Sequence, residues 1–403
     1  MPTVQLDQST GARSLPVVSG HQDALDGIRA TAAFAVLLFH VASGTGYISD
    51  TRDDALAWLL SRGEMGVPIF FTLSGLLLYL PWARTVLEGR PAPRTGRYLW
   101  KRALRLLPAY WALVVLTQFT YGREHVHDVW GWVKLLTLTY SYDPHNWWQG
   151  YLGPKGLGQI WSLTVEAAFY VTLPLTAVAL AAYARRGGDD LDRRGRRLLT
   201  GIGLYAAVSV AYTVVMAHSS QGALLGMWLP RYLTWFAVGM ALAVLSAWAR
   251  AVPAGSAARF CRTVGESWGA CWLIAALLYC VASTPVTGKS RLVADGIWTS
   301  QFNLLLYGLV AAFFVAPAAL AAQSHPALTA ILGNRVMRFL GKISYGVFLW
   351  QFVVMFTWFD VTGHPPFTGN LLVDFPVTAL LTVAVATVSY YVVEEPIRKL
   401  GLR

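Results

Sequence analysis

Long apolar runs, separated by short polar segments rich in arginine, dominate the chain. Ten of these runs approach the roughly 20 residues that a helix needs to cross a hydrocarbon core about 30 Å thick. They lie near residues 29–46, 66–83, 106–121, 161–184, 198–217, 230–249, 268–284, 302–322, 342–360 and 374–393. The pattern predicts an all-α, polytopic integral membrane protein with about ten transmembrane helices.

An eleventh run, residues 129–142, is shorter and contains Lys134. The two most basic segments, 84–105 and 185–197, decide how this run is counted. If it does not cross, two spans separate the two segments, and the positive-inside rule places both in the cytoplasm. We therefore predict that residues 129–142 form a re-entrant or interfacial segment, and that both termini are cytoplasmic.

Composition agrees with a membrane location. Hydrophobic residues make up 55% of the chain and charged residues 13%, with a mean hydropathy of +0.47, whereas soluble domains carry roughly a quarter charged residues. The net charge of +11 fits cytoplasmic loops better than nucleic-acid binding. The spacing of Cys261, Cys271 and Cys280 matches neither a zinc site nor a redox motif. We expect a multi-pass protein of the plasma membrane.

The first residues differ from the rest. Residues 1–21 are polar and lack the apolar stretch of a signal peptide. We therefore expect a flexible cytoplasmic tail at 1–21 and one transmembrane domain at 22–403, with no soluble domain at either end.

His40 is a titratable residue within an apolar run, eleven positions after Arg29. On a helix that rises 1.5 Å per residue it would lie about 16 Å from Arg29, near the middle of the membrane. Ionisable groups at such depth are costly and are usually functional. His40 could act as a general base or carry an acyl group, or it could be a buried histidine bonded to a neighbouring helix.

Glu166, Arg102 and Arg105 are the other ionisable candidates. Glu166 follows the start of a run by a few residues, so we expect it roughly 7 Å below the outer face, near the depth of His40. It could orient the imidazole or bond a backbone group. Arg102 and Arg105 share one helix face and could grip phosphates or contact lipid headgroups.

The polar loop before the eleventh run contains a weaker candidate site. His125, His127 and Asp128 could ligate a metal, but no further ligands follow at suitable spacing. We expect no metal site there. Arg231 could line a cavity at the outer face or reach the membrane surface.

Six motifs, in this order and spacing, resemble the membrane-bound acyltransferase 3 family from about residue 22 to the end. They are Arg29 with ten residues before His40, FFTLSGLLLYL at 70–80, RALR at 102–105, WSLTVEAAFY at 161–170, LGKISYGVFLWQF at 340–352 and VEEPIRK at 393–399. Each motif is weak alone, and the six together are specific.

The resemblance implies transfer of an acyl group, usually acetyl from acetyl-CoA, to a hydroxyl of a glycan, glycolipid, peptidoglycan or sugar-bearing antibiotic. It implies that His40 is essential and that Glu166 is the family glutamate. Arg29, Arg102 and Arg105 match the arginines needed for the acyl donor. Acyl-CoA would be a co-substrate, with no bound cofactor. Trp161, Arg231 and Ser74 are the residues that we expect to contact the acceptor.

Two positions depart from the family pattern. Ala167 stands where many members have a second acidic residue, and Gln351 stands where many have histidine. A second catalytic imidazole is therefore not expected. His40 would deprotonate the acceptor hydroxyl while Glu166 stabilises the imidazolium, or it would form an acyl-histidine.

Two alternatives remain at this stage. A transporter of a lipid-linked sugar could use His40 and Glu166 as a proton relay, and an inactive scaffold in a cell-envelope complex would use neither. The acceptor is open between a small glycoside such as a macrolide, as in antibiotic biosynthesis, and an envelope polysaccharide.

Overall fold

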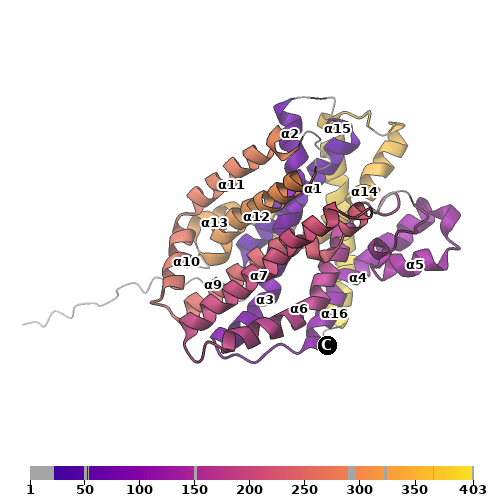
Figure 1. Ribbon diagram of the computed structural model, residues 1–403. Coiled ribbons are helices and arrows are strands. Elements are labelled where there is room, and N and C mark those ends of the chain that lie inside the picture. Colours follow the sequence, from indigo (N-terminus) through magenta and orange to yellow (C-terminus); the bar gives the residue numbers. More distant parts are fainter. Residues whose placement is uncertain are drawn as a thin grey trace, which may run out of the picture.

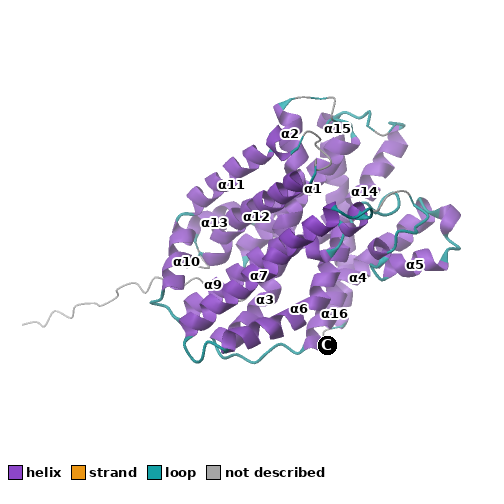
Figure 2. Cartoon of the chain, viewed as in Figure 1, coloured by secondary structure: helices purple, strands orange, loops and turns teal. Residues whose placement is uncertain are grey.

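The computed structural model describes residues 22–401, apart from 50–51, 53, 149–151, 289–295, 322–324 and 366. Within these ranges the chain is helical and contains no strand (Figure 1, Figure 2). The tail predicted at residues 1–21 lies outside the described residues.

Nine helical segments of the described chain are long and apolar enough to cross a membrane. Their helices are α1 (Asp23–Gly44), α3 (Gly66–Leu87), α4 (Thr95–Thr120), α6 (Trp161–Arg185), α7 (Leu191–Ala217), α9 (Leu233–Ala251), α12 (Ile297–Leu320), α14 (Arg335–Thr362) and α15 (Leu371–Ser389). The predicted span at 268–284 corresponds to α11 (Trp268–Ala282), which meets α10 (Ser256–Glu266) at an angle of 73°, and this bent pair makes a tenth span if it is counted as one. The predicted fold class is confirmed.

Shorter elements connect the spans. They are α2 (Ala55–Ser61), η1 (Arg62–Met65), η2 (Arg123–His125), α5 (Val129–Leu136), η3 (Tyr140–Tyr142), α8 (Gly222–Leu225), η4 (Leu229–Tyr232), η5 (Pro285–Thr287), α13 (Pro326–Leu332), the π-helix η6 (Tyr390–Glu394) and α16 (Glu395–Leu400).

The centre of the bundle is built on close helix contacts. α1 packs along both α3 and α14, and α3 packs closely along α9. A Cβ atom at Gly75 would meet the backbone of Phe236, and one at Gly239 would meet the backbone carbonyl of Thr72. Small residues of this kind let two helix backbones approach, so glycine fixes the distance between α3 and α9.

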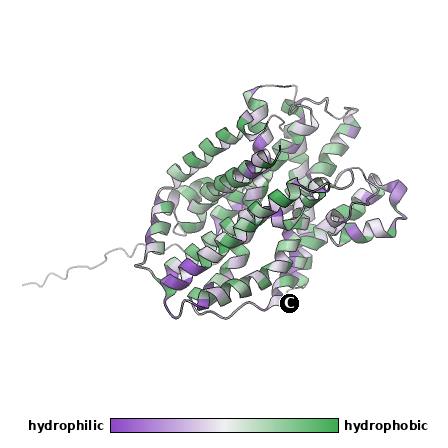
Figure 3. Cartoon of the chain, viewed as in Figure 1, coloured by the Kyte–Doolittle hydropathy of each residue, from purple (hydrophilic) through white to green (hydrophobic). Residues whose placement is uncertain are grey.

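The arginine-rich segments gather at one end of the bundle, which we call the arginine end. Glu88, after α3, lies 3.5 Å from both Arg84 and Arg250. Arg338 at the start of α14 pairs with Asp23 at the start of α1 at 3.2 Å. Trp248 near the end of α9 donates to Asp192 at the start of α7. Figure 3 shows hydrophilic colour at helix ends and in loops, and hydrophobic colour along the helices.

The segment that contains α5 folds back along α4 at the edge of the bundle (Figure 1). Tyr110 donates to the carbonyl of Leu135 at 2.5 Å, Trp111 donates to that of Leu136 at 2.9 Å, and Phe119 meets Trp132. α5 therefore runs antiparallel to the second half of α4. With eight residues, α5 is too short to cross a hydrocarbon core of about 30 Å, as expected of residues 129–142, and the choice between a re-entrant and an interfacial segment stays a prediction.

Lys134 holds the returning part of this segment. Its Nζ donates to Asp143 at 3.0 Å, to the carbonyl of His145 at 2.9 Å and to Asn146 at 3.1 Å. The backbone N–H of His145, together with Lys134, lowers the pKa of Asp143 below its ordinary value. Lys134, which makes this run less suited to cross the membrane, thus stabilises the loop that follows α5 through three hydrogen bonds.

Candidate active site

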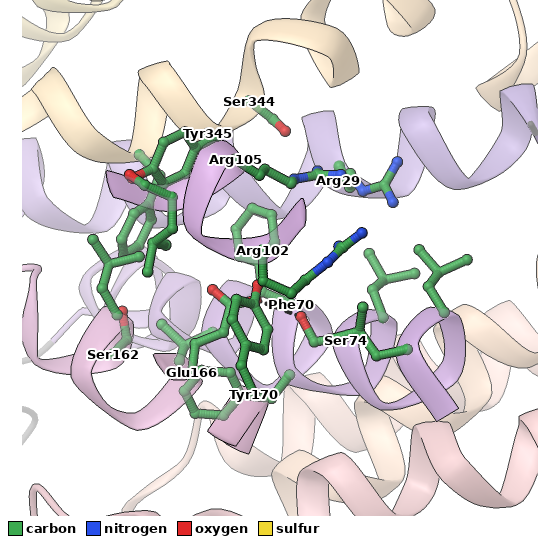
Figure 4. Close-up of a pocket in the computed structure, with 18 residues that line it drawn as sticks. Arg29, Phe70, Ser74, Arg102, Arg105, Ser162, Glu166, Tyr170, Ser344 and Tyr345 are labelled. Atoms are coloured by element: carbon green, nitrogen blue, oxygen red, sulfur yellow. Dashed lines mark hydrogen bonds between the residues drawn. The ribbon is translucent and has the colours of Figure 1, made fainter. Parts of the chain in front are cut away.

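A small cavity of about 90 Å³, which we call the arginine cavity, lies between α1, α3, α4, α6 and α14. Figure 4 shows the guanidinium groups of Arg29, Arg102 and Arg105 gathered on one side of it. Its other polar lining residues are Ser74, Ser162, Glu166, Tyr170, Ser344 and Tyr345. Three predicted donor-binding arginines from two helices therefore share one cavity with Glu166.

Glu166 is held by two hydroxyl groups. One carboxylate oxygen accepts from Ser74 of α3 at 2.5 Å and from Tyr170 at 2.6 Å. Tyr170 follows Glu166 by four positions on α6, so the two side chains lie on one helix face. Glu166 is thereby fixed beside the arginines.

The arginines of this cavity differ in their partners. Arg29 pairs with Asp26, three positions earlier on α1, at 2.5 Å. For Arg102 and Arg105, no carboxylate of the described residues lies within 4.0 Å, and the buried Nε of Arg102 has no hydrogen-bond partner there. Guanidinium groups without a carboxylate partner suit a negatively charged ligand.

His40 does not line the arginine cavity, and its bond to Gln351 determines which imidazole nitrogen carries the hydrogen. The imidazole Nδ1 is 3.0 Å from the side-chain oxygen of Gln351, whose amide nitrogen donates to the carbonyl of Phe348 at 2.8 Å. An amide oxygen can only accept, so Nδ1 carries the hydrogen and Nε2 keeps its lone pair. The ring packs between Phe39 and Phe352, with centroids at 5.1 and 4.4 Å.

A larger cavity of about 630 Å³, the aromatic cavity, contains His40 in its wall. This volume is in the range of small-molecule sites, which combine aromatic walls with a few polar groups. Its aromatic lining includes Trp161, Tyr232, Trp235, Tyr307 and Phe356, and its polar lining includes Ser43, Arg62, Glu64, Arg231 and Asn303. Two residues expected at the acceptor, Trp161 and Arg231, are therefore in one cavity with His40.

A charged network in this wall escaped the sequence analysis. Arg62 is 3% exposed and donates to the carbonyl of Ala282 at 2.8 Å, to Thr287 at 3.0 Å and to Tyr307 at 3.1 Å. Tyr307 donates to Glu64 at 2.7 Å, and Glu64 lies 3.5 Å from Arg62. The signal was the sequence RGE at 62–64, two charges directly before an apolar run.

The structure corrects the expected pairing of His40 with Glu166. His40 bonds Gln351, whereas Glu166 bonds Ser74 and Tyr170 and lines the cavity that contains Arg29. Glu166 is therefore near the level of Arg29, which is about 16 Å along α1 from His40. The reason is the start of α6, where Gln159 donates to the carbonyl of Leu349 in the middle of α14 at 2.5 Å. The helix begins inside the bundle.

Ser74 needs the same correction. We expected it at the acceptor with Trp161 and Arg231, but its hydroxyl donates to Glu166 in the arginine cavity. Since α3 runs past both cavities, its first residues face His40 and its middle faces the arginines.

The outer loop holds the weak metal candidates. His125 stacks on Trp147 with ring centroids 4.0 Å apart. In the part of the chain that the structure describes, no three His, Cys, Asp or Glu side chains are grouped to hold a metal ion.

Comparisons with known proteins give the family. A family model described as an acyltransferase domain matches residues 22–393. A peptidoglycan O-acetyltransferase of Listeria monocytogenes is 22% identical over 395 residues, covering 94% of this chain and 56% of that protein. A Bacillus subtilis protein, named a peptidoglycan O-acetyltransferase by inference, is 26% identical over 404 residues, covering 94% and 55%.

A nodulation protein of Rhizobium leguminosarum is 25% identical over 183 residues, covering 42% of this chain and 48% of that protein. The chain thus spans little more than half the length of the two O-acetyltransferase relatives. No solved structure matches the chain significantly. Because the family model covers almost all of it, this chain belongs to the acyltransferase 3 family.

Proposed function

We propose that the protein transfers an acyl group, in the first place acetyl, from acyl-CoA to a hydroxyl of a glycan or glycoside. The observation that carries the proposal is the free Nε2 of His40 at the wall of the 630 Å³ aromatic cavity, with the ring held by Gln351. A neutral imidazole held in this tautomer is prepared to take a proton from a hydroxyl.

The donor would approach from the arginine end. Arg29, Arg102 and Arg105 place positive charge there, and acyl-CoA is a polyanion. The two cavities are neighbours, because Val67 lines both and because Phe348 and Phe352, one turn apart on α14, line one each. A thioester carried past the arginines would therefore arrive beside His40.

The transfer itself needs one proton acceptor and one leaving group. His40 Nε2 takes the proton of the acceptor hydroxyl as its oxygen attacks the thioester carbonyl. The carbon–sulfur bond then breaks, and the sulfur of CoA leaves and recovers the proton from the imidazolium. In a two-step route the same Nε2 would attack the thioester first.

The acceptor would lie in the aromatic cavity. Aromatic rings such as Trp161 can stack on the apolar face of a sugar, while Arg62, Glu64, Arg231 and Asn303 can bond its hydroxyls. Two relatives are named for peptidoglycan, which favours a cell-envelope glycan as the acceptor class. A small glycoside would use the same surfaces.

The structure removes the reason for the transport alternative. That alternative needed His40 and Glu166 in one proton relay, yet they bond different partners and line different cavities.

The test follows radiolabelled acetyl from acetyl-CoA to a panel of glycan and glycoside acceptors, with purified wild-type protein and His40→Ala. We expect label on an acceptor with the wild type and at least a hundredfold loss in the variant, because general bases contribute about 10²–10⁴-fold. Equal thermal melting would show that the variant is folded. Wild-type transfer that survives in His40→Ala would contradict the assignment.

A further inference from the structure

A third cavity, the basic cavity, lies at the arginine end between α1, α4, α14 and the segment formed by η6 and α16. Its volume is about 720 Å³, again in the range of small-molecule and cofactor sites. It shares Arg29, Leu77, Arg105, Ser344 and Tyr345 with the arginine cavity. The two cavities therefore adjoin, and the basic cavity is the outermost of the three along the path toward His40.

Cations outnumber carboxylates in the lining. The basic residues are Arg29, Arg105, Arg335, Arg338, Lys342 and Arg398, and the acidic residues are Asp23, Asp26 and Glu394. Asp26 pairs with Arg29 and Asp23 pairs with Arg338. Among the described residues, no carboxylate lies within 4.0 Å of Arg335, Lys342 or Arg398. The cavity therefore has unneutralised positive charge from two separate helices.

Tyrosines of the π-helix position two of these cations. Lys342 Nζ lies 4.8 Å from the ring centre of Tyr390 and 5.0 Å from that of Tyr391. Arg398 donates to the hydroxyl of Tyr390 at 3.1 Å. Aromatic rings hold a cation without cancelling its charge, and π-helical turns often occur at functional sites. The turn presents both cations to the same cavity.

We propose that the basic cavity binds the nucleotide part of acyl-CoA, with its phosphates held by Arg335, Lys342 and Arg398. This inference rests on the proposed function and changes its sequence-based form, in which Arg29, Arg102 and Arg105 held the phosphates. Arg29 and Arg105 instead lie where the two cavities adjoin, and Arg102 lies beyond them in the arginine cavity, beside the pantetheine arm. About 16 Å along α1 from Arg29 to His40 is then left for that arm.

The closing experiment measures ligand binding by the full chain in detergent micelles, using CoA and acetyl-pantetheine, which lacks the nucleotide and the phosphates. The variant Arg335→Gln/Arg398→Gln removes one cation from each side of the cavity. The matched control, Arg196→Gln/Arg259→Gln, removes two exposed arginines that do not line it. Equal melting temperatures establish that all three proteins are folded.

We expect at least a tenfold weaker affinity for CoA in the cavity variant, with unchanged affinity for acetyl-pantetheine and wild-type behaviour in the control. Unchanged CoA affinity would overturn the inference and leave the proposed function standing. This is the result expected if the cations bind lipid headgroups instead of CoA. An equal loss of affinity for CoA and for acetyl-pantetheine would also overturn the inference, because the substitutions would then disturb the whole donor site and not only the part that binds the nucleotide. A wild type that binds no CoA would overturn the donor assignment itself.

Discussion

Gln351 shows how one neutral side chain can set the tautomer of an imidazole within the bundle. It is 1% exposed. Its side-chain oxygen accepts from the imidazole of His40, and its side-chain nitrogen donates to the carbonyl of Phe348. A rotated amide would place its NH₂ group against the imidazole and lose the second bond. We infer that Gln351 is a positioning residue for His40.

Gln351→Leu should lower kcat by about 10- to 100-fold, because the ring loses the bond that fixes its tautomer. The KM for acetyl-CoA should change little, since the arginines are untouched. Gln351→His should keep more activity than Gln351→Leu, because an imidazole nitrogen can accept the same hydrogen. Steady-state kinetics of both variants check this, and equal kcat in Gln351→Leu and wild type would refute the positioning role.

Arg102 offers a second prediction at the residue scale. Arg102→Gln should raise the KM for acetyl-CoA about tenfold or more, because the pantetheine arm would lose a hydrogen bond from the charged guanidinium, and such bonds contribute about 1.5–3 kcal/mol. Lys101→Gln is the matched control, because Lys101 is exposed and lines neither the arginine cavity nor the basic cavity. If both substitutions raised KM equally, general charge at the membrane surface would explain the effect.

At the scale of elements, the contact between α3 and α9 sets the shape of the aromatic cavity. Thr72 of α3 donates to the carbonyl of Trp235 on α9 at 3.1 Å, and Trp235 lines the cavity. Gly75 and Gly239 let the backbones meet around this bond. Helix spacing and site geometry therefore depend on the same glycines.

Gly239→Ala should destabilise the protein by about 1–3 kcal/mol, because the added methyl meets the backbone of α3 and one helix must shift. Gly203→Ala is the control, since Gly203 lies exposed on α7 with nothing within 4 Å of a Cβ. It should be neutral, or stabilising by up to about 1 kcal/mol. Thermal unfolding in detergent compares them, and an unchanged melting temperature for Gly239→Ala would contradict the packing argument.

At the scale of the whole molecule, the three cavities lie in series. The basic cavity adjoins the arginine cavity through Arg29 and Arg105, and the arginine cavity adjoins the aromatic cavity through Val67. A charged donor and a glycan acceptor would thus reach His40 from different cavities. The arrangement suits transfer of an acyl group from a donor at the arginine end to an acceptor in the aromatic cavity.

We therefore predict that the donor is used from the arginine end, which the positive-inside rule assigns to the cytoplasm. Sealed, everted membrane vesicles should transfer acetyl from external acetyl-CoA. Right-side-out vesicles should transfer acetyl from external acetyl-CoA only after they are permeabilised, because the charged donor does not cross the bilayer. Equal transfer by both kinds of sealed vesicle would show that the proposed orientation or donor path is wrong.

Much of this molecule could be predicted from its sequence. The apolar runs gave the candidate membrane spans, and the basic segments 84–105 and 185–197 indicated that residues 129–142 do not cross. The motifs indicated His40, Arg29, Arg102, Arg105 and Glu166, and the structure groups the last four in one cavity. These features are local, because the length of an apolar run and the spacing of charges follow from consecutive residues.

The sequence by itself determined which segments are long and apolar enough to span a membrane and which ionisable residues lie within or beside them. Tertiary structure alone decided which of them meet. Glu166 met Ser74 instead of His40 because α6 starts inside the bundle, where Gln159 bonds Leu349 in the middle of α14. Gln351 met His40 from 311 positions away. The depth at which a helix starts depends on packing between distant segments, and periodicity along one segment carries no record of it.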